Sequence, residues 1–313
     1  MKHPKFIFVI GGVMSSVGKG ITASSIGTIL QARGYRVTNI KCDMYVNIDA
    51  GTIRPTEHGE VFIGNDGIEA DQDLGNYERF TGNVMTAINY VTTGQVYQEV
   101  IRRERNLEYD GEDVEVVPDV PNEIIRRIKL AQKKNNAEIT IVELGGTIGE
   151  YQVLLFLEAA RIMKVNNIDD VAFVVVSYLP LPGHIGEMKT KPTQYAVRSL
   201  NAAGIWTNFI IARGVQALDN RRREILARVC NLQAGTVIAA PDVPSIMISP
   251  SFGSSISITS FKRTGVCAVI SRALPDFLQY PLTRTRFFLY IFSNSLLPKF
   301  PNDYINPLSR SAF

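Results

Sequence analysis

A glycine-rich segment near the N-terminus has the residue types that bind phosphate. Residues 11–21 read GGVMSSVGKGI, after an apolar run and before a helical pattern. Glycines let backbone N–H groups turn toward phosphate oxygens, and the helix N-terminus adds positive potential. Lys19 is spaced to reach the terminal phosphates of a nucleotide. The strict GxxxxGK[ST] pattern fails, because five residues separate Gly12 from Gly18 and Gly20 follows the lysine. The alternative is a tight strand-to-helix turn with an incidental lysine.

Carboxylates that could hold a metal ion occur at two places. Glu143 ends the apolar run ITIVE and is followed by Gly145 and Gly146, which leave room for a ligand. Asp71 and Asp73 lie in the polar stretch DGIEADQDLGNYERF, which shows neither helical nor strand periodicity. Phosphoryl transfer needs a divalent cation, and Mg²⁺ prefers carboxylate oxygens. Glu143 is predicted to act like a Walker-B acid, whereas a solvated or capping role is the alternative for the two aspartates.

Two basic positions add to this chemistry. Lys41 ends the second apolar run, beside Asp43. The segment MKTKPTQ places Lys189 and Lys191 two residues apart, just before a proline that can begin a helix. Two ammonium groups followed by threonine and glutamine side chains suit a triphosphate and a base edge. A solvated basic turn is the alternative for this segment.

Alternating elements are expected to position these residues. Strands are predicted at residues 6–10, 36–41, 114–117, 138–143, 171–177, 208–212 and 236–239, and helices at 21–33, 122–134, 151–164, 193–203 and 220–229. Nearly continuous apolar strands separated by amphipathic helices predict a parallel sheet covered on both faces. Ligands of such sheets bind at the carboxyl ends of the strands, which is where the lysines and acids above occur.

Composition limits the class of protein. Hydrophobic residues make up 45% and charged residues 20% of 313 residues, and no apolar run is long enough to cross a membrane. The three cysteines (Cys42, Cys230 and Cys267) are too few and scattered for a disulfide framework or zinc site. A reducing, cytoplasmic location is therefore expected.

The composition changes near residue 250. Residues 251–313 hold seven Lys/Arg against two Asp/Glu, and they are rich in aromatics. The basic residues are dispersed and no binding motif surrounds them, so a nucleic-acid partner is not expected. We expect one domain over residues 1–250 and a tail of unknown fold over 251–313. Our hypothesis is that this tail is a divergent or frame-shifted end.

These motifs resemble the amidoligase domain of the CTP synthase family. The matching stretches run in family order over roughly residues 4–250: GGVMSSVGKGI, KCDMYVNIDAGTIRP, HGEVFIGNDGIEADQDLGNYERF, VELGGTIGE, FLEA and GEMKTKPTQ. The resemblance implies a doubly wound, mostly parallel, P-loop NTPase-like α/β fold related to dethiobiotin synthetase. It also implies ATP-dependent amination of UTP to CTP through a 4-phosphorylated UTP.

The resemblance assigns roles residue by residue. It implies catalytic roles for Lys19 on the phosphates and Lys41 in γ-phosphoryl transfer, and magnesium binding by Asp73 and Glu143. The implied ATP-binding residues are Ser16, Val17, Gly18, Lys19, Gly20, Ile21, Asp73, Pro241, Asp242 and Val243. The implied UTP- and CTP-binding residues are Ser15, Glu150, Tyr151, Gln152, Lys189, Thr190, Lys191, Pro192, Thr193, Gln194 and Ile225.

Two of these positions depart from the family. Gln152 stands where the family has a carboxylate in its CTP/UTP site, so product inhibition by CTP is expected to change. Ile225 lies near the position where the family has a lysine, and Arg222 and Arg223 are close to it in the sequence.

The resemblance also implies a homotetramer and an ammonia donor. Beyond residue 250 the resemblance fades, and no histidine follows His184, so a glutamine-hydrolysing triad is not expected in this chain. Free ammonia or a separate source would then supply the nitrogen. Two alternatives remain: an inactive UTP- and ATP-binding paralogue that assembles with and regulates full-length CTP synthase, and a partitioning ATPase with a similar loop. The second usually has Thr after the loop lysine and lacks KTKPTQ.

Overall fold

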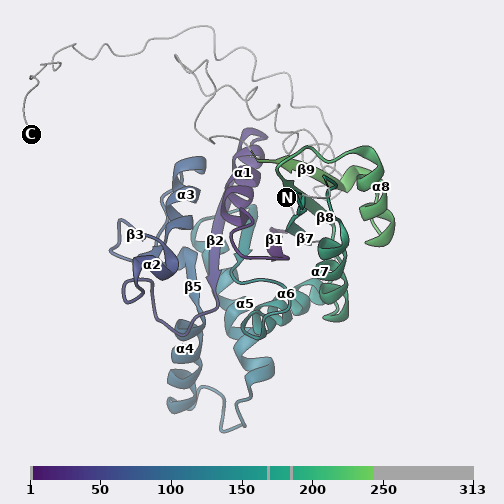
Figure 1. Cartoon of the computed structure of the whole chain (residues 1–313). Helices are drawn as coiled ribbons and strands as arrows, with labels where there is room; N and C mark the ends of the chain where they lie inside the picture. The colour runs from purple at the N-terminus through teal and green to yellow at the C-terminus, as the bar shows by residue number, and fades with distance from the viewer. Residues whose placement is uncertain (1–2, 168–169, 184–185, 243–313) are drawn as a thin grey trace, which may run out of the picture. The chain divides into compact units, whose positions relative to one another are not determined.

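A single parallel sheet organises the described part of the chain. A computed structural model describes residues 3–167, 170–183 and 186–242 (Figure 1). Every neighbouring pair of strands in its seven-stranded sheet is parallel. The strand order is β5 (Tyr90–Thr92), β2 (Val37–Asp43), β6 (Ile139–Leu144), β1 (Lys5–Gly12), β7 (Val171–Tyr178), β8 (Phe209–Gly214) and β9 (Val237–Pro241).

Helices cover both faces of this sheet. One face packs on α4 (Thr93–Arg105), α5 (Val116–Lys134), α6 (Leu154–Asn166), α7 (Lys191–Ala202) and α8 (Asn220–Val229). The other face packs on α1 (Lys19–Ala32) and α3 (Gln72–Thr81). The doubly wound α/β fold with a strand, glycine loop, lysine and helix at its centre is thus confirmed. Among the described residues, no helix is both long enough and apolar enough to cross a membrane.

Short elements complete the described chain. A two-stranded antiparallel hairpin, β3 (Val61–Ile63) and β4 (Glu69–Asp71), follows the one-turn helix α2 (Pro55–His58). Three 3-10 turns are η1 (Ala87–Asn89), η2 (Tyr151–Val153) and η3 (Ala234–Thr236).

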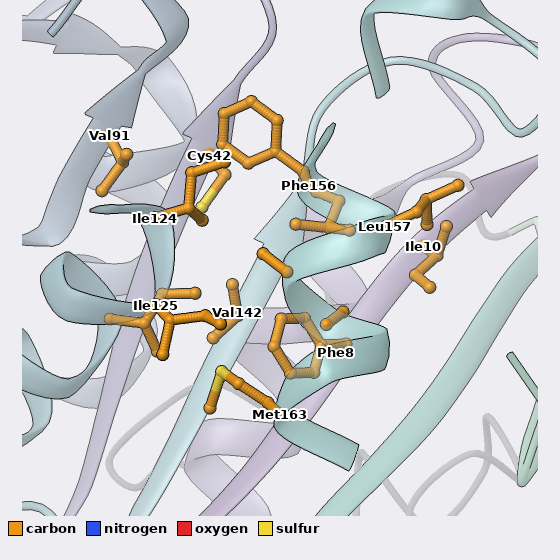
Figure 2. Close-up of a cluster of buried hydrophobic side chains, with 14 of the residues drawn as sticks. Phe8, Ile10, Cys42, Val91, Ile124, Ile125, Val142, Phe156, Leu157 and Met163 are labelled. Carbon is orange, nitrogen blue, oxygen red and sulfur yellow. The ribbon is translucent and has the colours of Figure 1, made fainter. Parts of the chain in front are cut away.

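The central strands are buried on both sides. Phe8 and Ile10 of β1 enter the core on the α5–α6 face, where Val142 of β6 and Phe156 of α6 also lie (Figure 2). The alternate β1 residues, including Val9, enter the opposite core. Burial of a large apolar side chain contributes about 1.5–3 kcal/mol, so this two-sided packing fixes the strands whose ends carry the polar residues.

Strand register brings two of those residues together. In the β2–β6 pair, Lys41 lies directly opposite Glu143. A slip of one residue would turn the side chains of the slipped strand to the wrong face. The apolar residues on either side of Lys41 and Glu143 therefore set the register that pairs them.

One predicted strand is wrong. Residues 114–117 do not form a strand; α5 begins at Val116, with Val117 in a non-helical conformation (φ −127°, ψ 120°). Pro118 excludes the helical region for the residue before it and has no N–H for a ladder. The edge position is taken by the three-residue strand β5, which is too short to show a pattern.

The absence of periodicity in residues 66–80 is also corrected. This stretch contains β4 and the ten-residue helix α3. Only Leu74 and Tyr77 of α3 are buried, so a polar sequence suffices for a helix that packs through a narrow stripe. Helix α4 was not predicted either, although Val96 and Val100 have helical spacing and are buried. The other predicted strands and helices are confirmed within a few residues, while the expected tail at 251–313 lies outside the described residues.

Candidate nucleotide-binding site

The glycine loop joins the central strand to a buried helix. Gly18 adopts a left-handed conformation (φ 85°) at the start of α1, where its carbonyl accepts the first helical hydrogen bond from Thr22 N at 3.0 Å. Ser15 and Ser16 are exposed along the loop, whereas Val17 is buried. A chain turning in this way leaves exposed main-chain N–H groups beside a helix N-terminus, which is the arrangement that binds phosphate.

The loop lysine lies back across the end of β1. A side chain at Gly11 would place its Cβ 2.9 Å from Lys19 Nζ, so glycine is required for the lysine to pass. Lys19 Nζ donates a hydrogen bond to the carbonyl of Gly146 at 3.0 Å. Burial lowers the pKa of Lys19, and the nearby Glu143 carboxylate partly opposes the shift. A nucleotide phosphate offers this lysine stronger acceptors than one carbonyl.

A second lysine is surrounded by acids at the next strand end. Lys41 is 5% exposed, and its Nζ donates to Asp73 and to Glu143 Oε1, the latter at 3.0 Å. Asp43 and Asp71 each have a carboxylate oxygen 3.8 Å from the same nitrogen. Burial alone would lower the pKa of Lys41, but these carboxylates raise it well above its usual value. Lys41 therefore carries a positive charge throughout the physiological range.

Helix α3 places two of the partners. Asp71 caps this helix by accepting a hydrogen bond from Asp73 N at 2.7 Å. The Asp73 side chain lies against the start of α1, because a Cβ at Gly20 would be 1.9 Å from Asp73 Oδ1. Fully buried Tyr77 donates its hydroxyl hydrogen to Glu143 Oε2. Helix α3 thus fixes Asp73 between Lys41 and the glycine loop and orients Glu143 as well.

The two acids assigned to magnesium share one cation in this structure. Both Asp73 and Glu143 contact Lys41 Nζ. Burial raises the pKa of Glu143 to about 7 despite the opposing charge of Lys41. Burial acts to raise the pKa of Asp73 as well, but the charge of Lys41 and hydrogen bonds to the carboxylate outweigh it and lower this pKa. Within the described ranges, no three His, Cys, Asp or Glu side chains form a metal site by themselves. Two carboxylates nevertheless fit Mg²⁺, which commonly takes one or two of them plus phosphates and water.

The segment after Glu143 forms a wall of the same region. Ile148 N donates to the carbonyl of Gly11 at 2.9 Å, which ties this segment to the end of β1. The Glu150 carboxylate lies over Gly146, where an added Cβ would be 3.1 Å from Oε2. Gln152 Nε2 donates to Glu150 Oε2 at 3.0 Å, so the two residues form one polar unit. Tyr151 is 88% exposed and does not pack on this segment.

The KTKPTQ segment begins α7 on the other side of β1. Buried Thr193 shares a hydrogen bond with Ser177 at 2.8 Å between the hydroxyl oxygens. Gln194 Nε2 donates to Thr190 Oγ1 at 3.0 Å. Lys191 is exposed at the helix start with Pro192 next to it, and Lys189 pairs with Glu187 at 3.1 Å.

Close packing joins this segment to the glycine loop. A Cβ at Gly12 would lie 2.9 Å from the Cβ of Ala196 and 3.6 Å from Ile148 Cδ1. The end of β1 therefore separates α7 from the segment that carries Glu150. Both elements pack on Gly12, the last residue of β1 before the glycine loop, so α7 flanks the strand end that leads into this loop.

An arginine at the end of β8 was not identified from the sequence. Arg213 pairs with Asp242 at 2.6 Å and donates to the carbonyl of Val17 at 3.4 Å. A Cβ at Gly18 would lie 2.2 Å from Arg213 Nη1. Asp242 N also donates to Gly214 O at 2.8 Å. Asp242, and with it Pro241 at the end of β9, is thus held beside the glycine loop.

Two of the assigned residues stand apart from these contacts. Ile225 is half-buried on α8, about one turn after Arg222. Val243 lies outside the described residues. Tyr77, Arg213 and Arg222 contact segments of the site but were given no role from the sequence. Tyr77 lies in a stretch that matches the family, Arg222 is close to Ile225, and Arg213 lies at a strand end, so each had a signal that could have marked it.

Known proteins resemble most of this chain. The family model described as CTP synthase N-terminus matches residues 5–261. A protein named CTP synthase from Prochlorococcus marinus (strain AS9601) is 44% identical over 264 residues, which cover 84% of this chain and 48% of the relative. Its namesake from strain MIT 9211 is 45% identical over 265 residues, covering 84% of this chain and 46% of the relative. The chain spans about half the length of the curated relatives it matches.

Among solved structures, the similarity is more distant. The signal recognition particle 54 kDa protein of Aeropyrum pernix K1, in complex with GDP, is 13% identical with a TM-score of 0.41, covering 86% of this chain and 49% of that one.

Proposed function

Because this chain belongs to the family of CTP synthase N-terminal domains, we propose that it converts UTP to CTP with ATP and ammonia. The observation that supports this most directly is the placement of Lys19, Lys41, Asp73 and Glu143 in one connected cluster beside the glycine loop. Phosphoryl transfer requires this combination of fixed cations and carboxylates, since catalysis depends mainly on positioning and charge neutralisation.

On the ATP side, the glycine loop and Lys19 would bind the phosphates. Lys19 would exchange the Gly146 carbonyl for phosphate oxygens, which also compensates the cost of its burial. Lys41, charged at all relevant pH values, would contact the γ-phosphoryl group as it moves to O4 of UTP. Asp242, fixed by Arg213, would border the adenine. In this step the bond from the β–γ bridging oxygen to the γ-phosphorus breaks and a bond from O4 to that phosphorus forms.

On the UTP side, the basic start of α7 would hold the nucleotide. Lys189 and Lys191 supply charge for the triphosphate, and Thr190 and Gln194 supply hydroxyl and amide groups for its polar edges. Glu150 with Gln152 would form the facing wall. Phosphorylation makes O4 a good leaving group, so that ammonia adds at C4, phosphate departs and a proton is released. A water-poor site favours amination over hydrolysis.

Magnesium fits the remaining pair of carboxylates. Asp73 and Glu143 would hold Mg²⁺, whose charge screens the phosphates and favours the transferring geometry. To bind it, Glu143 must be ionised and Lys41 must give up at least part of its contact with both acids. The release of Lys41 from these acids leaves its ammonium group free for the γ-phosphate.

The ammonia source, regulation and assembly are parts of the same proposal. Ammonia would come from solution or from a separate glutaminase. CTP would compete with UTP, with an altered affinity because Gln152 replaces a carboxylate. We also propose that the chain assembles into a homo-oligomer, a tetramer by resemblance to the family, and that it works in the cytoplasm.

A single assay tests the proposal. The full chain is incubated with UTP and Mg-ATP, with ammonium chloride in one reaction and glutamine in another, and CTP is measured by chromatography. We expect CTP with ammonium chloride, its loss in Lys19→Ala, and no change in Lys134→Ala, an exposed lysine on α5. CTP in neither reaction, with UTP and ATP still bound, would refute catalysis and support the regulatory alternative. Absence of binding would refute both.

A further inference from the structure

Arg222 on α8 contacts three separate groups through one guanidinium. Its Nε donates to the main-chain carbonyl of Met188 at 2.9 Å, and its Nη2 pairs with Glu187 Oε1 at 3.0 Å. Its Nη1 pairs with Asp219, at the beginning of the same helix. The planar fork of arginine can satisfy these directions together, whereas a lysine ammonium cannot.

The contacted segment is the one that leads into KTKPTQ. Met188 is buried in the small core between α7 and α8. Lys189 N donates to Pro180 O at 2.9 Å, so the main chain is held on a second side. Lys189 Nζ pairs with Glu187 Oε2 at 3.1 Å, while Arg222 takes the other oxygen of the same carboxylate. Arg222 and Lys189 are therefore linked through Glu187.

Helix capping alone does not account for this arrangement. Asp219 caps α8 by accepting from the main-chain N of Arg222 at 2.8 Å, and that bond needs no arginine side chain. The Met188 and Glu187 contacts reach out of the helix. Their direct effect is on the position of Lys189.

We propose that Arg222 is a positioning residue for UTP, which holds the Met188 main chain and the Glu187 carboxylate so that Lys189 faces the triphosphate. This inference rests on the proposed function, in which the start of α7 binds UTP. Arg222 itself does not touch the nucleotide.

The shared carboxylate explains how Lys189 can change partners. The Glu187 and Lys189 side chains are 56% and 38% exposed, and such exposed pairs are weak. Lys189 can therefore exchange Glu187 for phosphate at little cost. Because Arg222 keeps Glu187 paired, the carboxylate is held away from the incoming phosphates and competes less for the lysine.

The test measures binding of each nucleotide separately, with the full chain and Mg²⁺. Dissociation constants for UTP and for a non-hydrolysable ATP analogue are obtained by calorimetry. The variants are Arg222→Ala, Arg222→Lys and, as a control with the same charge change on the same helix, Arg221→Ala, whose side chain is exposed. Loss of a charged hydrogen bond that orders the segment predicts about a tenfold rise in the UTP dissociation constant for Arg222→Ala. The UTP dissociation constant of Arg222→Lys is expected to lie between those of Arg222→Ala and the unmodified chain.

The outcomes separate this inference from the function beneath it. We expect Arg222→Ala to bind UTP more weakly and the ATP analogue as tightly as the unmodified chain does. Arg221→Ala should bind both nucleotides like the unmodified chain. Equal losses for both nucleotides would show a general structural role and overturn the inference. A UTP dissociation constant for Arg222→Ala within twofold of that of the unmodified chain would overturn the inference about Arg222 and leave the proposed function intact. No UTP binding by the unmodified chain would overturn the proposed function together with it.

Discussion

Replacing Lys41 with methionine tests whether one ammonium group balances the acids at the centre of the site. In the unmodified chain, Lys41 Nζ lies within 3.8 Å of four carboxylates and 3.0 Å from Glu143. Methionine has a similar length and no charge, so the packing of the β2 end changes little. Lys19 would remain as the nearby cation, since it is close enough for the charges of Glu143, Asp73 and Asp43 to act on its pKa.

The expected loss of stability follows from the burial of the pair. Lys41 and Glu143 have side chains that are 6% and 1% exposed. Removing one partner of a buried pair costs about 3–5 kcal/mol, because the other charge remains without compensation. We expect Lys41→Met to lose about this much in metal-free buffer at pH 7.5. Mg²⁺ should add more stability to the variant than to the unmodified chain. At a Mg²⁺ concentration 100 times the variant's dissociation constant, the gain for the variant would be about 2.7 kcal/mol.

Urea unfolding followed by far-ultraviolet circular dichroism, with EDTA or MgCl₂, measures both effects. Lys129→Met is the control, since Lys129 is exposed on α5 and its loss should change stability by less than about 0.5 kcal/mol. A loss below about 1 kcal/mol for Lys41→Met without metal would refute the view that Lys41 compensates these acids. Equal Mg²⁺ effects in both proteins would refute the view that Lys41 and magnesium share the carboxylates.

Three further predictions concern the same cluster. Because burial raises the pKa of Glu143 to about 7, the folded state holds this proton more tightly than the unfolded state. The stability of the metal-free protein should therefore fall as the pH rises from about 4.5 to 7, by roughly 3 kcal/mol in total. Comparing urea unfolding of Glu143→Gln with the unmodified chain across this window isolates the effect, and parallel pH profiles would contradict it. In Gly20→Ala, the new Cβ would displace the Asp73 carboxylate, so Mg-ATP binding measured by calorimetry should weaken about tenfold or more with little change in circular dichroism; unchanged affinity would show that Asp73 has no part in it. Tyr77→Phe leaves a buried Glu143 oxygen without its donor, so stability should fall by about 1–3 kcal/mol and the Mg²⁺ concentration for half-maximal ATP binding should rise; a stability loss with unchanged Mg²⁺ dependence would limit Tyr77 to a structural role.

The parallel fold and the chemistry of its edge were predictable because they depend on local patterns. Lys19 follows a glycine loop, and Lys41 and Glu143 each lie at the end of an apolar run. Their direct contact was not predictable, since it requires β2 and β6 to be neighbours with Lys41 opposite Glu143. Strand order is set by how the helices pack, and no single run of sequence contains it.

Residues that act from helices were harder to predict. Asp73 was predicted as a candidate ligand, but its place on a helix beside Tyr77 was not, because the sequence of α3 is polar and only a narrow stripe of it is buried. Arg222 binds a main-chain carbonyl, and a main-chain partner leaves no mark on residue types. The wrong strand at 114–117 has a simpler cause: its valines favour a strand, but Pro118 follows them and α5 begins at Val116.

The strand order also has a consequence for how the chain reaches its folded state. Lys41 and Glu143 are 102 positions apart, and β1 pairs with β6 and β7 rather than with a strand next to it in the sequence. Such distant pairings require long loops to close before contacts compensate for the lost entropy, which slows folding. Strand β1 therefore leaves the ribosome with both edges unpaired, and they stay unpaired at least until residues 139–144 have been synthesised. During that interval the nascent chain exposes an apolar strand to other chains, and protection by a chaperone would matter most at this stage.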